Sequence, residues 1–316
     1  MSPTRRNAAL GLLAAAAAAP GARALAQPAE IGAEPIELPD EDQPNTSLDT
    51  TRNRNEHMLA PVTINNQGPF NFLLDTGANV SCVSHRLMER LELKSAESAA
   101  VHTMVGVRHR PIVILDRLQV GPRDRRRVRA PALPIDAGVD GILGVDWLKG
   151  QRLVLDFKGN KMEIVKSKRD VNEPGRVAVV PARRRHGQLT IVDADLSGKR
   201  ISAIIDSGAQ GSLCNRKLRD IVHAAEARKG QLGPPRYVRM ETVAGETFTG
   251  ESLFLPFLRL GGLHLGNVGV TYADMHVFDI WGLKDTPALV IGMDLLSQFE
   301  DVALDFGRSA VRFAFT

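Results

Sequence analysis

Two aspartates in the chain occur in the same local setting. Asp75 follows the apolar run Phe72-Leu73-Leu74, Asp206 follows Ala203-Ile204-Ile205, and each begins an Asp-(Thr/Ser)-Gly-Ala segment. Two carboxylates held within hydrogen-bonding distance cannot both ionise cheaply, so such a pair shares one proton. If two such turns meet, one carboxyl can accept a proton while the other donates one. That chemistry suits hydrolysis of an amide bond by an activated water.

The residues after each aspartate have properties that would hold a carboxylate in place. Glycine suits a turn whose backbone must approach another group closely or take a positive φ. The Thr and Ser side chains offer hydroxyl groups, and Ser in the second copy keeps the hydroxyl of the first. We therefore expect the following residues to support the two aspartates: Thr76, Gly77, Ala78, Ser207, Gly208 and Ala209.

Further segments recur in the same order after each aspartate. The paired segments are Val80-Ser81-Cys82-Val83 with Ser212-Leu213-Cys214, the expected helices 84–91 with 215–221, Ile142-Leu143-Gly144 with Val290-Ile291-Gly292, and 153–157 with 302–306. Only two copies are present, so the pattern differs from the many short repeats of a solenoid. The order and similar spacing indicate a duplicated domain.

The duplicated motif resembles the retropepsin-like and pepsin-like aspartic proteases, and in particular the bacterial proteins with two retroviral-protease-like halves. The resemblance covers roughly residues 56–316. It implies that Asp75 and Asp206 are the catalytic pair, and that the Thr and Ser hydroxyls bond across to the opposite loop. It also implies that the apolar-Gly stretches pack beside the turns, namely Ile142, Leu143, Gly144, Val290, Ile291 and Gly292.

The same resemblance implies a glycine-tipped hairpin, or flap, in each half. The candidates share a Thr-x-x-Gly pattern, from Thr103 to Gly106 and from Thr242 to Gly245. Neither contains the tyrosine that pepsin-like enzymes carry on their flap. Ala78 and Ala209 follow the viral type, which implies less acidic working conditions than those of gastric enzymes.

The predicted fold is all-β and bilobal, with two retropepsin-like closed β-barrel lobes and a few short helices. The 43% apolar content is enough for two cores, and runs such as 111–115 and 200–205 are typical of strands. We expect an N-terminal lobe over 56–165, a connector over 166–176 and a C-terminal lobe over 177–316. The lobes meet either within one chain, as a monomer with a pseudo-two-fold axis, or across a dimer.

The expected function is that of an exported aspartic endopeptidase that binds a polypeptide as an extended strand and needs no cofactor. The alternative is a catalytically weak or inactive periplasmic peptide-binding protein with the same fold. The sequence contains no zinc motif and no Gly-x-Ser-x-Gly elbow, so we expect no metal site and no serine nucleophile.

The N-terminus has the features of a targeting segment. Arg5 and Arg6 precede an apolar stretch, and Ala24-Leu25-Ala26 supplies a small-x-small cleavage site, so residues 1–26 are expected to be a signal peptide of the Sec or twin-arginine type. Export to a bacterial periplasm follows, and no later segment is long and apolar enough for a membrane span. Residues 27–55 are acidic and Pro-rich, so we expect a disordered leader that serves as a tether or a propeptide.

Charge and cysteine content add two further expectations. The formal charge of +4 falls when Arg5, Arg6 and Arg23 leave with the signal peptide. The basic clusters at 123–129 and 183–186 are interpreted as solvated loops or hairpin tips, and an aromatic content of 5% offers no base-stacking surface for nucleic acid. Cys82 and Cys214 either form a disulfide or lie apart as buried thiols, and the second reading is preferred.

Overall fold

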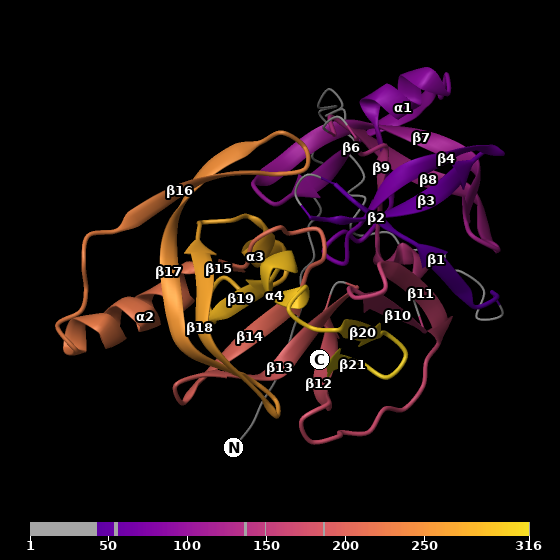
Figure 1. Ribbon diagram of the computed structural model, residues 1–316. Coiled ribbons are helices and arrows are strands. Elements are labelled where there is room, and N and C mark those ends of the chain that lie inside the picture. Colours follow the sequence, from indigo (N-terminus) through magenta and orange to yellow (C-terminus); the bar gives the residue numbers. More distant parts are fainter. Residues whose placement is uncertain (1–42, 54–55, 136–137, 149, 186, 316) are drawn as a thin grey trace, which may run out of the picture.

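The computed structural model describes residues 43–53, 56–135, 138–148, 150–185 and 187–315. The predicted signal peptide and residues 27–42 of the leader lie outside this described part. Two lobes rich in β-strands lie side by side, with one helix at the outer edge of each (Figure 1). The fold is therefore all-β and bilobal, as predicted.

The N-terminal lobe is built mainly from antiparallel hairpins. Its elements are β1 (Thr46–Asp49), β2 (Thr51–Arg52), β3 (Met58–Ile64), β4 (Gln67–Leu74), β5 (Cys82–Ser84), α1 (His85–Arg90), β6 (Ser95–Thr103), β7 (Gly106–Val120), β8 (Arg123–Leu133), β9 (Gly141–Leu143), the 3₁₀ turn η1 (Val145–Trp147), β10 (Gln151–Asp156) and β11 (Lys161–Lys166). The strands β3-β4-β9-β5-β8-β7 are successive neighbours, and β7 also pairs with β3. This last pairing closes the lobe into a barrel.

The C-terminal lobe repeats this plan. Its elements are β12 (Val177–Arg185), β13 (Gln188–Leu196), β14 (Lys199–Ile205), β15 (Leu213–Cys214), α2 (Arg216–Arg228), β16 (Arg236–Glu241), β17 (Thr247–Leu260), β18 (Leu263–Tyr272), α3 (Val277–Ile280), β19 (Ala288–Ile291), α4 (Met293–Leu296), β20 (Asp301–Asp305) and β21 (Ala310–Ala314). The ring β13-β14-β19-β15-β18-β17 closes through a pairing of β13 with β17. Both halves therefore form barrels.

A shared sheet joins the two lobes. Its strand order is β1-β11-β10-β20-β21-β12, and β10 of the first half pairs antiparallel with β20 of the second. Leu153 lies opposite Leu304 and Val154 opposite Ala303 in this pairing. The predicted pair of strands at 153–157 and 302–306 is therefore the seam at which the lobes meet within one chain.

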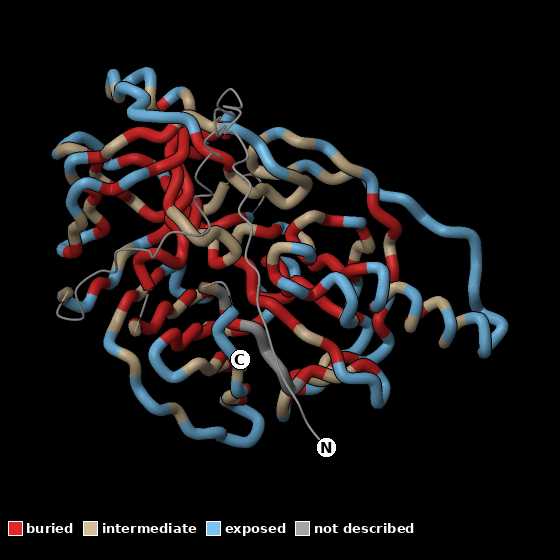
Figure 2. Tube along the Cα trace, turned by 180° about the vertical axis from the view of Figure 1, so that it is seen from behind, coloured by how far each residue is buried: buried red, intermediate tan, exposed pale blue. Residues whose placement is uncertain are grey.

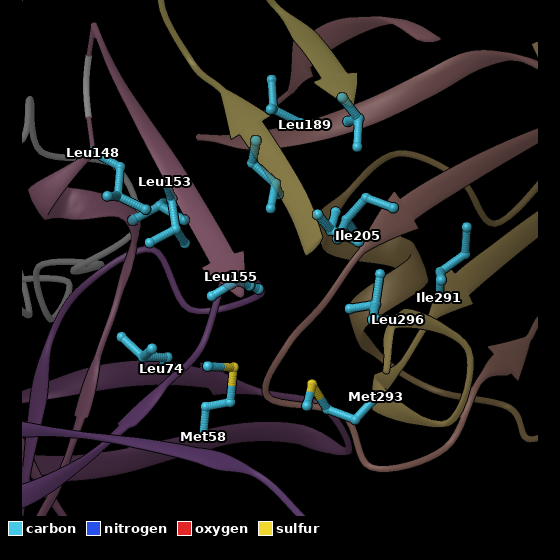
Figure 3. Close-up of a cluster of buried hydrophobic side chains, with 14 of the residues drawn as sticks. Met58, Leu74, Leu148, Leu153, Leu155, Leu189, Ile205, Ile291, Met293 and Leu296 are labelled. Atoms are coloured by element: carbon cyan, nitrogen blue, oxygen red, sulfur yellow. The ribbon is translucent and has the colours of Figure 1, made fainter. Parts of the chain in front are cut away.

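Buried side chains from both lobes form one continuous core at this seam. Leu74 and Leu153 from the first half and Ile205 and Leu296 from the second belong to the same cluster (Figure 3). Buried segments concentrate along the strands of both barrels, whereas the outer hairpins and α2 are largely exposed (Figure 2). Burial of this apolar surface is the main force that holds the lobes together.

The two predicted helices after the aspartate turns are present. Ser84 caps α1 by accepting from the Leu87 amide, and Asn215 caps α2 by accepting from the Leu218 amide. A side-chain oxygen at this position satisfies one of the amides that a helix leaves free at its start. The second helix is longer than predicted and continues to Arg228, because Leu218 and Val222 bury one helical face against the barrel.

The prediction of a disordered leader over 27–55 is wrong for its final part. Thr46–Asp49 forms β1 and pairs with β11, while Thr51–Arg52 forms β2 and pairs with β3. The acidic side chains that suggested disorder are concentrated before Gln43, whereas Thr46 and Thr50 are buried. The end of the leader therefore supplies one edge strand to the shared sheet and another to the sheet of the N-terminal barrel.

The prediction that the basic clusters form solvated loops or hairpin tips is wrong in part. Residues 123–129 lie in β8, where Arg123 is buried and donates to the Pro44 carbonyl, and Arg125 forms an ion pair with the buried Asp146. Residues 183–185 lie in β12 and are exposed. Both clusters border a hairpin turn, but their described arginines are strand residues, and His186 lies outside the described residues. The charge of an arginine run hides the alternation of side chains that indicates a strand.

Candidate active site

Asp75 and Asp206 meet at the boundary between the lobes. Each directly follows the end of a barrel strand, β4 or β14, and their carboxyl groups hydrogen-bond to each other. Asp206 is buried and Asp75 is half-buried. The two turns approach so closely that a Cβ on Gly77 would lie 2.5 Å from Asp206 Oδ2, and one on Gly208 would overlap the Asp75 carboxyl. Only glycine fits at these two positions.

The hydroxyls of Thr76 and Ser207 lock the turns together across the seam. Thr76 Oγ1 donates to the Ile205 carbonyl at 2.9 Å and accepts from the Ser207 amide at 3.0 Å. Ser207 Oγ donates to the Leu74 carbonyl at 2.8 Å and accepts from the Thr76 amide at 3.2 Å. Each hydroxyl thus donates one hydrogen bond and accepts another, and neither turn can shift without breaking bonds to the other.

The pKa values of the two carboxyls are both raised. Burial raises the pKa of Asp75 well above its usual value, and the neighbouring charge of Asp206 raises it further, against the opposing amides of Gly77 and Ala78. Burial also raises the pKa of Asp206, but hydrogen bonds from the Gly208 amide and from Asp75 favour its ionised form. Burial of both carboxyls therefore favours a state in which Asp75 and Asp206 share one proton.

The predicted apolar-Gly stretches lie directly beside the turns. Leu143 pairs with Leu74 in parallel register, and Ile291 pairs with Ile205 in the same way. The remaining predicted members, Ile142 and Val290, lie in these same short strands. A Cβ on the glycine that ends each stretch, Gly144 or Gly292, would overlap the backbone that follows Ala78 or Ala209. These glycines let the support strand pack against the turn.

A second pair of acids, of which Asp146 is buried and Asp294 is exposed, was not selected from the sequence. Asp146 accepts from Ser81 Oγ at 2.8 Å, and Asp294 accepts from Ser212 Oγ at 2.7 Å. Each serine in turn accepts from the amide of the nearby support glycine at 3.1 Å. The recurrence of Asp two residues after this glycine in both halves is the signal that would have identified them.

Both flap candidates lie at hairpin turns. Thr103–Gly106 connects β6 to β7, and Thr242–Gly245 connects β16 to β17. Met104 and Val105 pack against the apolar cluster of the C-terminal lobe that contains Ala209, whereas Val243 packs against the N-terminal cluster that contains Ile142. Each hairpin tip therefore covers an apolar wall that belongs to the opposite lobe.

Other predicted features are placed as follows. Cys82 and Cys214 are free and buried in different clusters, so they do not form a disulfide. Within the described residues, no three His, Cys, Asp or Glu side chains gather as a metal site would require. A search of the same part of the chain for a helix able to span a membrane found none.

Comparison with known proteins matches both halves to aspartyl protease families. Residues 60–150 match the family described as "gag-polyprotein putative aspartyl protease", and residues 192–295 match the family described as "Aspartyl protease". Among curated proteins, none matches the chain. The two matched segments contain the two aspartate turns and their apolar-Gly stretches. The chain therefore belongs to the retropepsin-like aspartic proteases, with two protease halves in tandem.

Proposed function

We propose that this protein is an exported aspartic endopeptidase that hydrolyses peptide bonds with a water activated between Asp75 and Asp206. The observation that carries the proposal is the hydrogen-bonded carboxyl pair at the seam, held by reciprocal hydroxyl bonds from Thr76 and Ser207. A pair locked in this way needs no rearrangement to share a proton. The aspartyl protease families matched by both halves support the same chemistry.

The reaction divides between the two acids according to their protonation. Asp206, as carboxylate, accepts a proton from the water while the water oxygen bonds to the scissile carbonyl carbon. Asp75 donates its proton to the carbonyl oxygen, and a gem-diol forms. Asp206 then protonates the amide nitrogen, the C–N bond breaks, and the gem-diol returns a proton to Asp75. The pair ends with one shared proton, as it began.

The substrate would bind as an extended strand between the turns and the two hairpins. The tips of those hairpins cover apolar walls on both sides of the carboxyl pair. Backbone groups of a strand offer hydrogen bonds along its length, and its alternate side chains point to opposite sides. Entry of such a strand requires the hairpins to lift from the walls.

The test is cleavage of an unfolded protein by the chain from residue 27 over a range of pH. We expect Asp75→Asn and Asp206→Asn each to lower the rate by at least about 100-fold, because each acid transfers protons in the reaction. Pepstatin is expected to inhibit the wild type. Asp116→Asn, at an exposed position on β7, is the matched control and is expected to retain full activity.

The outcomes of this test distinguish an active protease from a peptide-binding protein with the same fold. Unchanged cleavage in both dyad variants would show that another site is responsible. Peptide binding by the wild type without any turnover would favour a binding protein with the same fold. Loss of cleavage in Asp116→Asn as well would mean that the variants report stability rather than chemistry.

Export is the second part of the proposal, and it rests on the arginine pair, apolar stretch and Ala24-Leu25-Ala26 site at the N-terminus. We expect the protein expressed in a Gram-negative host to appear in the periplasmic fraction, with Gln27 as its first residue. Amino-terminal sequencing of the fractionated protein measures both. Intact Met1 in a cytoplasmic fraction would refute export.

We further propose that the protein acts as a monomer, since the two halves meet within one chain.

A further inference from the structure

The hairpin of the N-terminal lobe is tied to the C-terminal lobe by polar bonds as well as by apolar packing. The Val277 amide donates to the Met104 carbonyl at 3.3 Å. Thr103 Oγ1 donates to Glu246 Oε2 at 3.0 Å, and Arg108 Nε lies 2.9 Å from Glu246 Oε1. Glu246 directly follows the tip of the other hairpin, so these bonds join one hairpin to the other.

Two imidazoles extend this connection across the seam. His102 Nδ1, from β6, lies 3.1 Å from Nε2 of His276, which immediately precedes α3. Their rings are nearly parallel, with an interplanar angle of 12° and a centroid distance of 5.3 Å. A hydrogen bond between two ring nitrogens requires one to donate and the other to accept. The bond therefore exists only while at least one imidazole is neutral.

We propose that these contacts form a latch that holds the hairpins closed at neutral pH, and that protonation of the His102–His276 pair opens it in mild acid. When both rings are protonated, both facing nitrogens carry hydrogen and positive charge at a distance set by the closed hairpin. The pair then repels instead of bonding. Histidine is the side chain that ordinarily changes charge between about pH 5 and pH 8.

The charged groups around the imidazole pair do not offset the positive charge that a second proton would add. On β7, Arg108 and His109 lie opposite Val101 and Ala100 of the histidine's own strand. On the other side, the nearby acids already have basic partners: Glu246 with Arg108, Asp274 with Arg216 and Asp279 with Lys284. The surroundings of the latch are thus basic or already paired, and double protonation of the imidazoles favours opening.

This inference rests on the proposed function only for one consequence, namely that mild acid lets substrate reach the carboxyl pair. Opening itself is measurable without cleavage, through one of the two tryptophans of the chain. Trp281 is buried in the cluster that Met104 and Val105 cover, whereas Trp147, from the N-terminal lobe, is buried in the continuous core that both lobes share. Lifting the hairpin exposes the cluster around Trp281, and acrylamide quenching of its fluorescence reports the exposure.

The experiment uses the Asp75→Asn chain, which removes self-cleavage and one partner of the titrating carboxyl pair. We expect the quenching constant to rise about twofold between about pH 8 and pH 5, the range in which histidine gains its proton. Trp281→Phe in this background should remove the rise. His102→Gln and His276→Gln should each remove it too, because glutamine cannot charge. His264→Gln, at an exposed position on β18, should keep it.

The readouts distinguish the latch from the function. A flat quenching profile in the parent, or a rise that survives both His102→Gln and His276→Gln, overturns the latch even if dyad-dependent cleavage is found. A histidine-dependent rise in a protein whose wild type never cleaves overturns the proposed function and leaves the latch standing. Circular dichroism at each pH verifies that the folded state persists. Thr103→Val removes the hydroxyl that contacts Glu246 and the Gly106 carbonyl but leaves both histidines in place, and it is expected to raise quenching at every pH.

Discussion

At the scale of single residues, the two halves of the site are alike in sequence and in electrostatics. Asp75 and Asp206 occupy equivalent turns, and burial raises the pKa of both carboxyls. Turn amides oppose this effect in both halves by favouring the charged forms. The duplicated motif has thus produced two coupled carboxyls that can share one proton.

Protonation of Asp75 leads to a prediction about stability. Since its pKa is raised on folding, the folded chain binds more protons than the unfolded chain, and stability falls as pH rises toward the folded pKa. Asp75→Asn cannot ionise, so we expect its Tm at pH 7 to exceed that of the wild type by about 2 °C or more. The gain should disappear below about pH 4, where the unfolded aspartate is also protonated.

Scanning calorimetry of both proteins between these pH values tests this prediction, with Asp116→Asn as the control for loss of an exposed charge. A gain that is larger at low pH than at pH 7 would contradict it. The Asp75→Asn variant is expected to be inactive, so the same substitution raises the Tm and lowers the cleavage rate.

At the scale of elements, the close approach of the two aspartate turns depends on the absence of a side chain at one position in each turn. Gly77 and Gly208 each lie against the aspartate of the opposite lobe. The support strands β9 and β19 then pair in parallel with the strands that lead into the turns. A buried strand, a turn without side-chain bulk and a parallel support strand together place each carboxyl.

This packing predicts a strong effect from one added methyl group. We expect Gly77→Ala and Gly208→Ala to lower the cleavage rate by at least about 100-fold, because the new Cβ displaces the opposing carboxyl and reacting groups tolerate little misplacement. Gly233→Ala is the matched control, since a Cβ there meets nothing within 4 Å. Steady-state kinetics of the three variants measures the effect, and wild-type rates in Gly77→Ala would refute the close approach of the turns.

At the scale of the whole molecule, the two lobes are not independent domains. The shared sheet pairs β10 with β20, and one hydrophobic cluster includes residues of both halves. Separation of the lobes would expose that cluster and also break the reciprocal bonds of Thr76 and Ser207. The packing of the two lobes against each other therefore also assembles the site.

A shared core predicts that both lobes unfold together. Trp147 reports the first lobe and Trp281 the second, so Trp281→Phe and Trp147→Phe variants isolate each signal. We expect the two urea midpoints to coincide, as two-state unfolding requires. Leu304→Ala at the seam is expected to lower both midpoints equally, at a cost of about 2–5 kcal/mol. Separate midpoints for the two tryptophans would contradict a single cooperative unit.

The elements whose signals are local were predictable from the sequence. The apolar lead-in, the Asp-(Thr/Ser)-Gly-Ala turn and the later apolar-Gly stretch each occupy a few adjacent residues, and their repetition indicated two equivalent barrels. The capping residues Ser84 and Asn215 likewise precede their helices directly. The strands β1 and β8 were missed because acidic or basic composition outweighed a weak alternation of side chains.

What the sequence by itself determined is the kind of turn that ends β4 and β14, since backbone and side-chain preferences there depend on immediate neighbours. Only the tertiary structure decided that each hairpin tip packs against the opposite lobe and which side chains meet over the site. His102 and His276 are separated by 174 positions, and Thr103 and Glu246 by 143. Contacts over such distances depend on how two finished barrels pack, and no pattern of nearby residues encodes that packing.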